Sequence, residues 1–299
     1  MKHIAFRSAA LAAAITLTLF STSRGDVAKP AGSTTGAGTG VPGNPTAPTA
    51  PGARAIGGGT TINGSATVTT TPAAPVKVAV KLPPQPADVA APKLGPDGQP
   101  QAVFIKMHEG FLERRKQPID VLFLGDSITQ GWSGGGKQVW TERYTKLNAA
   151  NFGIGGDRTQ HVLWRIEQGE LDGIKPKVVV LMIGTNNMGS PEEEIIRGDK
   201  KIVEEIHKKL PDTKLMLLGI FPRAADAKNP ARAKIKTINE ALAKLDDGKK
   251  TRYLDIGAKF LDAEGNLPKD IMPDALHPNA KGYQIWADAI DPLLGEMMK

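Results

Sequence analysis

The hydrophobic pattern from about Ala102 to the C-terminus alternates short apolar runs with amphipathic stretches. Runs of four to seven apolar residues, with no polar alternation, indicate strands that are buried on both faces. The stretches between them carry apolar residues three and four positions apart, which is typical of helices packed on one side. The expected strands are 120–125, 150–154, 177–183, 214–220 and 252–256. The expected helices are 104–116, 159–171, 191–210, 229–245 and 279–298.

This alternation predicts the fold class. Parallel strands need a crossover connection, and the expected helices between successive strands supply one each time. We therefore expect an α/β protein, a three-layer α/β/α sandwich around a central, mostly parallel five-stranded sheet of the flavodoxin-like, doubly wound kind. Ligands bind such sheets beyond the carboxyl ends of the strands. The residues that directly follow each apolar run are therefore the ones to inspect for chemistry.

The N-terminal third has a different character. Lys2 and Arg7 precede an apolar run that ends at Phe20, as in a secretory signal peptide, although an uncleaved anchor fits because no clean Ala-x-Ala site follows. Pro, Gly, Thr and Ala then dominate to residue 98, a composition too poor in apolar surface to fold alone. We expect a signal peptide or anchor over 1–25, a disordered linker over 26–98 and a catalytic domain over 99–299. The protein would then be secreted, periplasmic or associated with the cell envelope.

Charge and cysteine usage narrow the function classes. The net charge is +7, but eight basic and three acidic residues fall in the first 100 positions, so the folded part is almost neutral. The sequence contains no basic stripe with interleaved aromatic residues, so it does not indicate nucleic-acid binding. The chain has no Cys, which excludes disulfides, thiol catalysis and Cys-based metal sites. The five His are scattered without metal-ligand spacing, so we expect neither a metal nor a cofactor.

Two serines are candidates for a nucleophile. Ser127 follows the first expected strand directly, in Gly-Asp-Ser, where a helix begins; its alternative role is that of a helix N-cap. Ser133 lies in Gly-Trp-Ser-Gly-Gly, which formally matches the nucleophile elbow of α/β-hydrolases. That elbow needs a strand directly before the serine, and Ser133 comes eight residues after the strand in a glycine-rich, flexible loop. The pattern therefore favours Ser127.

The other parts of a serine hydrolase site have candidates as well. Asp274 and His277 stand three residues apart before the last expected helix, where a carboxylate could orient an imidazole base, or where both could be incidental to a surface loop. Gly156 follows the second strand and could offer a backbone N–H to an oxyanion, or form a plain turn. Asn186 follows the third strand and could offer its side-chain amide, or be a turn residue. All of these positions fall at one edge of one expected sheet.

Four segments carry a resemblance to a known family. They are residues 121–128 (VLFLGDSI), 151–165 (NFGIGGDRTQHVLWR), 184–187 (GTNN) and 274–277 (DALH). In order and spacing they resemble the blocks of the SGNH (GDSL-like) hydrolase superfamily, and most of all its platelet-activating factor acetylhydrolase branch. The resemblance runs from about residue 104 to about residue 294. It differs from the usual third block, Gly-x-Asn-Asp, because Asn187 stands where that block has Asp, as it does in the acetylhydrolase branch.

The resemblance implies a role for each candidate. Ser127 would be the nucleophile and, through its N–H, the first oxyanion donor. The N–H of Gly156 and the side chain of Asn186 would be the other two donors. His277 would be the base, oriented by Asp274.

The expected function is a serine ester hydrolase that acts through an acyl-enzyme on short-chain acetyl esters of a small molecule or a glycan. Carbohydrate O-deacetylation is the first candidate, because an exported enzyme on a spacer would meet acetylated polysaccharide. The alternatives are a lysophospholipase or thioesterase of the same fold, and a non-catalytic carbohydrate- or wall-binding module. The N-terminal third has no counterpart in the intracellular acetylhydrolases, so their natural substrate is not carried over. The oligomeric state is left open.

Overall fold

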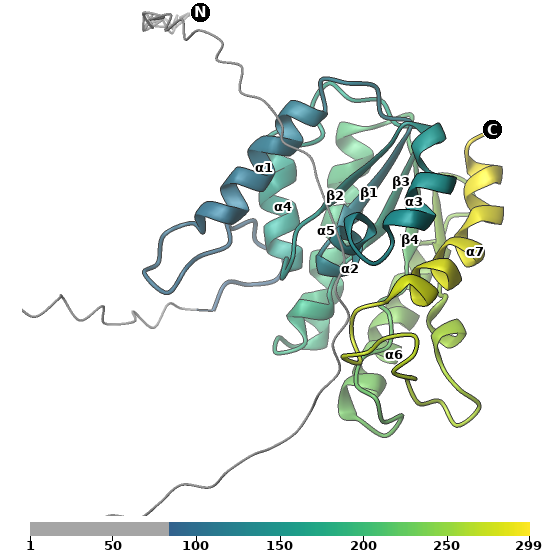
Figure 1. Ribbon diagram of the computed structural model, residues 1–299. Coiled ribbons are helices and arrows are strands. Elements are labelled where there is room, and N and C mark those ends of the chain that lie inside the picture. The colour runs from purple at the N-terminus through teal and green to yellow at the C-terminus, as the bar shows by residue number, and fades with distance from the viewer. Residues whose placement is uncertain (1–83) are drawn as a thin grey trace, which may run out of the picture. The chain divides into compact units, whose positions relative to one another are not determined.

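The computed structural model describes residues 84–299, which contain one five-stranded sheet in the order β2-β1-β3-β4-β5 (Figure 1). All four strand pairs are parallel, so the sheet is fully parallel rather than mostly so. The strands are β1 (Val121–Gly125), β2 (Ala149–Gly153), β3 (Val178–Met182), β4 (Lys214–Leu218) and β5 (Thr251–Leu254). The helices are α1 (Ala102–Arg114), α2 (Ser127–Gln130), α3 (Lys137–Arg143), α4 (Thr159–Glu167), α5 (Glu192–Lys209), α6 (Pro230–Leu242) and α7 (Ala280–Met297). The predicted α/β fold class is confirmed, and the strand order is that of flavodoxin-like sheets.

Two apolar layers cover the sheet, one on each face. Alternate residues of β1 point to opposite sides, so Leu122 packs with α4, α5 and α6, whereas Phe123 packs with α3 and α7. Figure 1 shows α1, α4 and α5 on one side of the sheet and α3 and α7 on the other. Every residue of β1 and β3 is buried, which explains why these strands appear in the sequence as continuous apolar runs.

The register brings the ends of three strands to one level. Gly125, the last residue of β1, is paired with Gly153 at the end of β2 and with Met182 at the end of β3. Gly125 must lack a side chain, because a Cβ there would collide with the carbonyl oxygen of Met182 and with Thr129. The loops after β1, β2 and β3 therefore start side by side.

The segment before α1 belongs to the folded domain. Ala87 is fully buried, and its carbonyl oxygen accepts a 2.7 Å hydrogen bond from the hydroxyl of Thr159 on α4. Asp88 accepts hydrogen bonds from Arg197 and Lys201 on α5. The linker boundary predicted at residue 98 is therefore wrong, because residues 84–98 bury side chains and satisfy polar groups of the domain. Composition misled here, since a Pro- and Ala-rich segment can be ordered by contacts made elsewhere in the chain.

The remainder of the predicted linker and the predicted signal peptide or anchor lie outside the described residues. Across residues 84–299, no helix combines the length and the apolar composition that crossing a membrane requires.

Candidate active site

Ser127 is the first residue of α2, two positions after the end of β1. The preceding residue, Asp126, caps this helix by accepting a 2.9 Å hydrogen bond from the N–H of Ile128. The hydroxyl of Tyr283 on α7 donates a 2.6 Å hydrogen bond to the carbonyl oxygen of Ile128. The turn that carries Ser127 is thus held from both sides, and the cap role that could have explained Ser127 belongs to Asp126 instead.

Asp126 is fully buried, and the burial raises the pKa of its carboxyl to about 7. The hydrogen bond from Ile128 opposes this shift, and the neighbouring Asp157 adds to it.

His277 and Asp274 reach Ser127 from the loop that precedes α7. The Oγ of Ser127 lies 2.9 Å from Nε2 of His277, and Nδ1 of His277 lies 2.6 Å from Oδ2 of Asp274. The other carboxylate oxygen of Asp274 accepts hydrogen bonds from the backbone N–H groups of Leu276 and His277. Ala275 adopts a left-handed backbone conformation, with φ of 58°, which folds the loop back so that residues three apart meet.

The environment of Asp274 favours its ionised form. Partial burial acts to raise the pKa of this carboxyl, but the hydrogen bonds from the ring and backbone of His277 outweigh it, and the pKa is lowered. An ionised carboxylate at Nδ1 places the ring proton there and leaves Nε2 free to accept the proton of Ser127.

Three candidate donors lie at the ends of neighbouring strands. Within residues 84–299, neither the N–H of Ser127 nor the N–H of Gly156 has a hydrogen-bond acceptor. A Cβ placed on Gly155 would lie 3.9 Å from Cβ of Ser127, so the loop after β2 runs directly beside the serine. Gly156 has a φ of 74°, a conformation that favours glycine. The amide of Asn186 donates a 2.8 Å hydrogen bond to the carbonyl oxygen of Asp157, which leaves its second N–H available.

A buried arginine ties these loops together. The guanidinium of Arg165, on α4, donates to the carbonyl oxygens of Gly125 at 3.3 Å and Phe152 at 3.2 Å, and its Nε donates to Asp157 at 3.0 Å. It also forms an ion pair with Glu170, which in turn bonds to His108 on α1. This network of buried polar and charged side chains fixes the ends of β1 and β2 from below the site.

Asn187, which stands where the usual third block has Asp, makes a contact that an Asp could also make. Its Oδ1 accepts a 3.0 Å hydrogen bond from the N–H of Thr159, the first residue of α4, and its Nδ2 donates to Gln160. The acceptor oxygen is the part that an Asp would also supply, so Asn serves here while adding a second bond.

Ser133 takes no part in this arrangement. It ends a short 3₁₀ turn, Gly131–Ser133, and its exposed Oγ accepts a 3.3 Å hydrogen bond from Asn151. The expected flexible loop is a packed turn, because Trp132 is buried in the aromatic cluster against α7.

A cavity of about 520 Å³ lies beside the loop after β2. Its lining is largely polar and comprises Pro84, Gln85, Lys93, Leu94, Gln101, Gly155, Gly156, Arg158 and His161. Nδ1 of His161 accepts a 3.1 Å hydrogen bond from the N–H of Arg158, so in the neutral ring the proton lies on Nε2. Burial, followed by the charges of Lys93 and Arg158, lowers the pKa of His161 to about 3, so the ring stays neutral.

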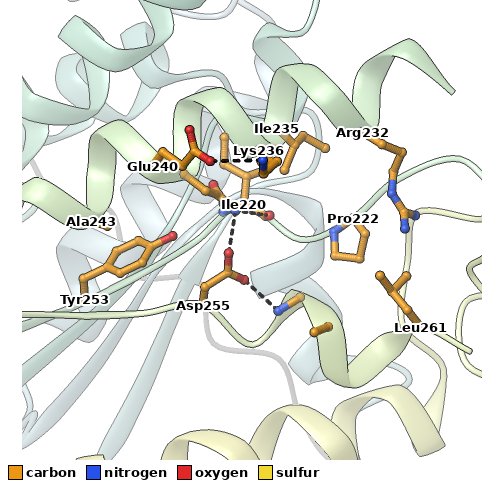
Figure 2. A pocket seen from close by; sticks show the side chains of 13 residues that line it. Ile220, Pro222, Arg232, Ile235, Lys236, Glu240, Ala243, Tyr253, Asp255 and Leu261 are labelled. Carbon is orange, nitrogen blue, oxygen red and sulfur yellow. Dashed lines mark hydrogen bonds and ion pairs between the residues drawn. The ribbon is translucent and has the colours of Figure 1, made fainter. Parts of the chain in front are cut away.

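A second cavity of about 520 Å³ lies apart from this chemistry, between α6 and the ends of β4 and β5 (Figure 2). Figure 2 shows Asp255 among the lining residues, where its carboxylate accepts hydrogen bonds from Asn239 and from the N–H of Gly257. Its lining contains neither serine nor histidine, so it offers no nucleophile and base for acyl transfer.

Comparison with known proteins agrees with this geometry. Residues 123–285 match the sequence profile of the GDSL-like lipase/acylhydrolase family. The chain is 37% identical over 201 residues to platelet-activating factor acetylhydrolase IB subunit alpha1 of Bos taurus, covering 66% of this chain and 85% of that one. It is 36% identical over 212 residues to the alpha2 subunit of Rattus norvegicus, covering 70% of this chain and 91% of that one. The chain belongs to the GDSL-like lipase/acylhydrolase family.

Solved structures support the same fold. A GDSL-like lipase from Bacteroides thetaiotaomicron superimposes with a TM-score of 0.52 at 21% identity, over 63% of this chain and 97% of that one. A G-D-S-L family protein from Veillonella parvula gives a TM-score of 0.51 at 19% identity, over 59% and 98% of the two chains. Family membership and the acetylhydrolase relatives make this GDSL-family chain a carboxylic ester hydrolase.

The structure places Ser127, His277 and Asp274 in hydrogen-bonding contact. Gly156 and Asn186 lie in the loops after the two strands that flank β1, and Ser133 lies outside this arrangement.

The structure adds two residues that sequence reasoning missed. Lys93 was hidden in a segment assigned to the linker by its composition. Arg165 is the last residue of the second block of the resemblance, but no role was expected for it, because a single Arg near the end of an amphipathic helix is usually solvated.

Proposed function

We propose that this family member is a serine esterase that removes short acyl groups, acetyl above all, from a polar alcohol such as a sugar hydroxyl. The observation that carries the proposal is the continuous chain of contacts from Ser127 through His277 to Asp274, at 2.9 Å and 2.6 Å. These are hydrogen-bonding distances between a hydroxyl, an imidazole and a carboxylate in the order that nucleophilic catalysis requires.

The reaction proceeds in two halves. Nε2 of His277 takes the hydroxyl proton of Ser127 as Oγ attacks the carbonyl carbon of the ester, and the negative charge moves to the carbonyl oxygen. The N–H groups of Ser127 and Gly156 and the amide of Asn186 stabilise that oxyanion. The tetrahedral intermediate collapses, the alcohol leaves with the proton from His277, and the acyl group stays on Ser127. Water then attacks the acyl-enzyme and gives a proton to His277. The bond between Oγ and the acyl carbon breaks, Ser127 takes the proton back from His277, and the acid is released.

The choice of acyl and alcohol parts rests on two further observations. The relatives at 37% and 36% identity are named acetylhydrolases, which supports an acetyl group. The cavity beside Gly156 carries Lys93, Arg158 and a neutral His161 that donates from Nε2, and these groups suit hydroxyls better than an alkyl chain. The same lining argues against a lysophospholipase or a thioesterase for long acyl chains, which would need an apolar channel.

Export completes the proposal. The basic and apolar start of the sequence, followed by a Pro- and Gly-rich stretch, supports an enzyme carried beyond the cytoplasmic membrane, where acetylated polysaccharides are found. A non-catalytic binding module would not need a hydroxyl, an imidazole and a carboxylate at successive hydrogen-bonding distances, as Ser127, His277 and Asp274 are.

The test is a substrate panel against the purified full-length protein. We expect kcat/KM for p-nitrophenyl acetate to exceed that for the octanoate, because an acyl site matched to acetyl would exclude added methylenes. We also expect acetate release from acetylated xylan or acetylated chitooligosaccharide. Equal or greater activity on octanoate would contradict the acyl assignment. Activity on p-nitrophenyl acetate without acetate release from any glycan would contradict the proposal that the alcohol part of the substrate is a sugar hydroxyl.

A further inference from the structure

A lysine from the segment before α1 reaches the loop that follows β2. Nζ of Lys93 donates a 2.6 Å hydrogen bond to the carbonyl oxygen of Gly155 and lies 2.8 Å from Oδ1 of Asp157. The Lys93 side chain is only 11% exposed, and Asp157 is fully buried. The residue between the two contacts is Gly156, the donor proposed for the oxyanion.

The carbonyl of Gly155 and the N–H of Gly156 belong to the same peptide group. In a trans peptide these two bonds point in opposite directions, and the described chain contains no cis peptide. A Cβ on Gly156 would lie 3.6 Å from Nζ of Lys93, whereas a Cβ on Gly155 would lie 3.9 Å from Cβ of Ser127. An ammonium that holds the carbonyl of Gly155 therefore directs the N–H of Gly156 to the opposite side of the peptide, in a loop that runs beside Ser127.

We propose that Lys93 is a positioning residue for the oxyanion hole, which it sets by fixing and polarising the Gly155–Gly156 peptide. The proposal rests on the serine esterase function above. A charged donor on the carbonyl strengthens the opposite N–H as a donor, since hydrogen bonds along one peptide polarise each other. A donor that is already oriented also needs no reorganisation when charge develops in the transition state.

Lys93 supports a second donor through Asp157. The side chain of Asp157 pairs with Lys93, and its carbonyl oxygen accepts the hydrogen bond from Asn186. A shift of Asp157 would therefore move the amide of Asn186 as well. Two of the three proposed donors thus depend on one ammonium group.

The backbone of Lys93 is itself anchored, so its reach is fixed. Its carbonyl oxygen accepts a 2.8 Å hydrogen bond from the N–H of Gln101, and the next residue, Leu94, forms a bridge with Pro100. Nζ of Lys93 also lies 5.5 Å from the ring centroid of Phe104 on α1. The start of α1 therefore presents the lysine to the site.

The test compares the full-length protein with Lys93→Met, which keeps the apolar stem and removes the ammonium. Because a misplaced donor acts on the transition state, we expect kcat for p-nitrophenyl acetate to fall about 10–100-fold with KM changed less than about threefold. The matched control is Lys201→Met. Its Nζ donates to the carbonyl oxygen of Asp88 at 3.1 Å, so it holds the same segment without touching the loop after β2. We expect its kcat to stay within about twofold of wild type.

A chemical rescue separates positioning from folding, and it is simple because the chain has no cysteine. Lys93→Cys is alkylated in urea with 2-bromoethylamine, which restores an ammonium at nearly the same reach, or with 1-iodopropane, which adds a neutral chain of similar length. Both products are refolded and compared by tryptophan fluorescence and by kcat per folded molecule. We expect the aminoethyl product to recover most of the wild-type kcat and the propyl product to match Lys93→Met.

The outcomes are distinguishable. Normal kcat in folded Lys93→Met, or equal kcat in the two alkylated products, overturns the role of Lys93 while the esterase function stands. An equal loss in Lys201→Met also overturns it, because the loss would then follow from loosening the segment. Wild-type protein without activity on any ester of the panel would overturn the proposed function and this inference with it.

Discussion

The side-chain amide of Asn186 donates to the carbonyl oxygen of Asp157 at 2.8 Å, across the gap between the loops after β3 and β2. An amide nitrogen carries two hydrogens, so this bond uses one and fixes the direction of the other. Asn186 is therefore a candidate hydrogen-bond donor whose second N–H has a defined orientation, and not only a residue that suits a turn.

We therefore predict that Asn186→Ala lowers kcat for p-nitrophenyl acetate by about 10²–10³-fold with little change in KM. The reason is that the free N–H is aimed at charge that exists only in the transition state. The check is a full kinetic analysis together with the melting temperature of the variant. A variant that melts earlier but turns over normally while folded would assign Asn186 to the turn alone.

The N-terminal boundary of the domain can be tested by truncation. A chain that begins at residue 84 keeps the contacts of Ala87 and Lys93, whereas one that begins at residue 99 loses both. The shorter chain removes the 2.7 Å acceptor of the Thr159 hydroxyl and one of the cationic partners of Asp157. We expect its unfolding free energy to be lower by about 3 kcal/mol or more, measured by urea denaturation. Equal stability of the two chains would show that residues 84–98 are dispensable.

A buried acid predicts how stability changes with pH. Asp199 on α5 is fully buried, and neither of its carboxylate oxygens has a hydrogen-bond partner among residues 84–299. Burial raises its pKa well above 3.8, with a further contribution from the charge of Asp126. Above pH 3.8 the folded protein therefore holds a proton that the unfolded chain releases, and stability falls as the pH rises until the folded pKa is passed.

Asp199→Asn removes this titration. Relative to wild type, the variant should gain stability as the pH rises above 3.8, by up to about 1.4 kcal/mol for each pH unit, measured by urea unfolding. Asp212→Asn, at an exposed position, is the matched control for the loss of a carboxylate at the surface. Parallel stability curves for wild type and Asp199→Asn would mean that Asp199 is ionised in the folded protein at pH 5.

Much of the fold was predictable because its signals are local. Buried parallel strands such as β1 and β3 appear as unbroken apolar runs, and the crossover helices separate them at regular intervals. The placement of Ser127, Gly156 and Asn186 after neighbouring strands was predictable for the same reason, since each follows one of these runs and parallel strands end at a common edge.

The parts that escaped prediction depend on contacts between distant residues. Lys93 and Asp157 are 64 positions apart, and the sequence around Lys93 does not predict a buried ion pair. Asn187 could be noted as a departure from the third block, but only the fold places its oxygen on the N–H of Thr159. The buried network around Arg165 likewise joins α1, α4 and two strand ends, so no window of sequence contains it.

The central claim is that Ser127, and not the serine of the glycine-rich turn, carries the acyl group. The most direct measurement is kcat for p-nitrophenyl acetate in Ser127→Ala and Ser133→Ala, two single substitutions of the same size. Because Ser127 lies 2.9 Å from Nε2 of His277, its loss should lower kcat by about 10⁴-fold or more. Ser133, whose Oγ bonds only to Asn151 among the described residues, should be replaceable with less than about a twofold change. A dead Ser133→Ala variant, or a Ser127→Ala variant that keeps its activity, would contradict the account.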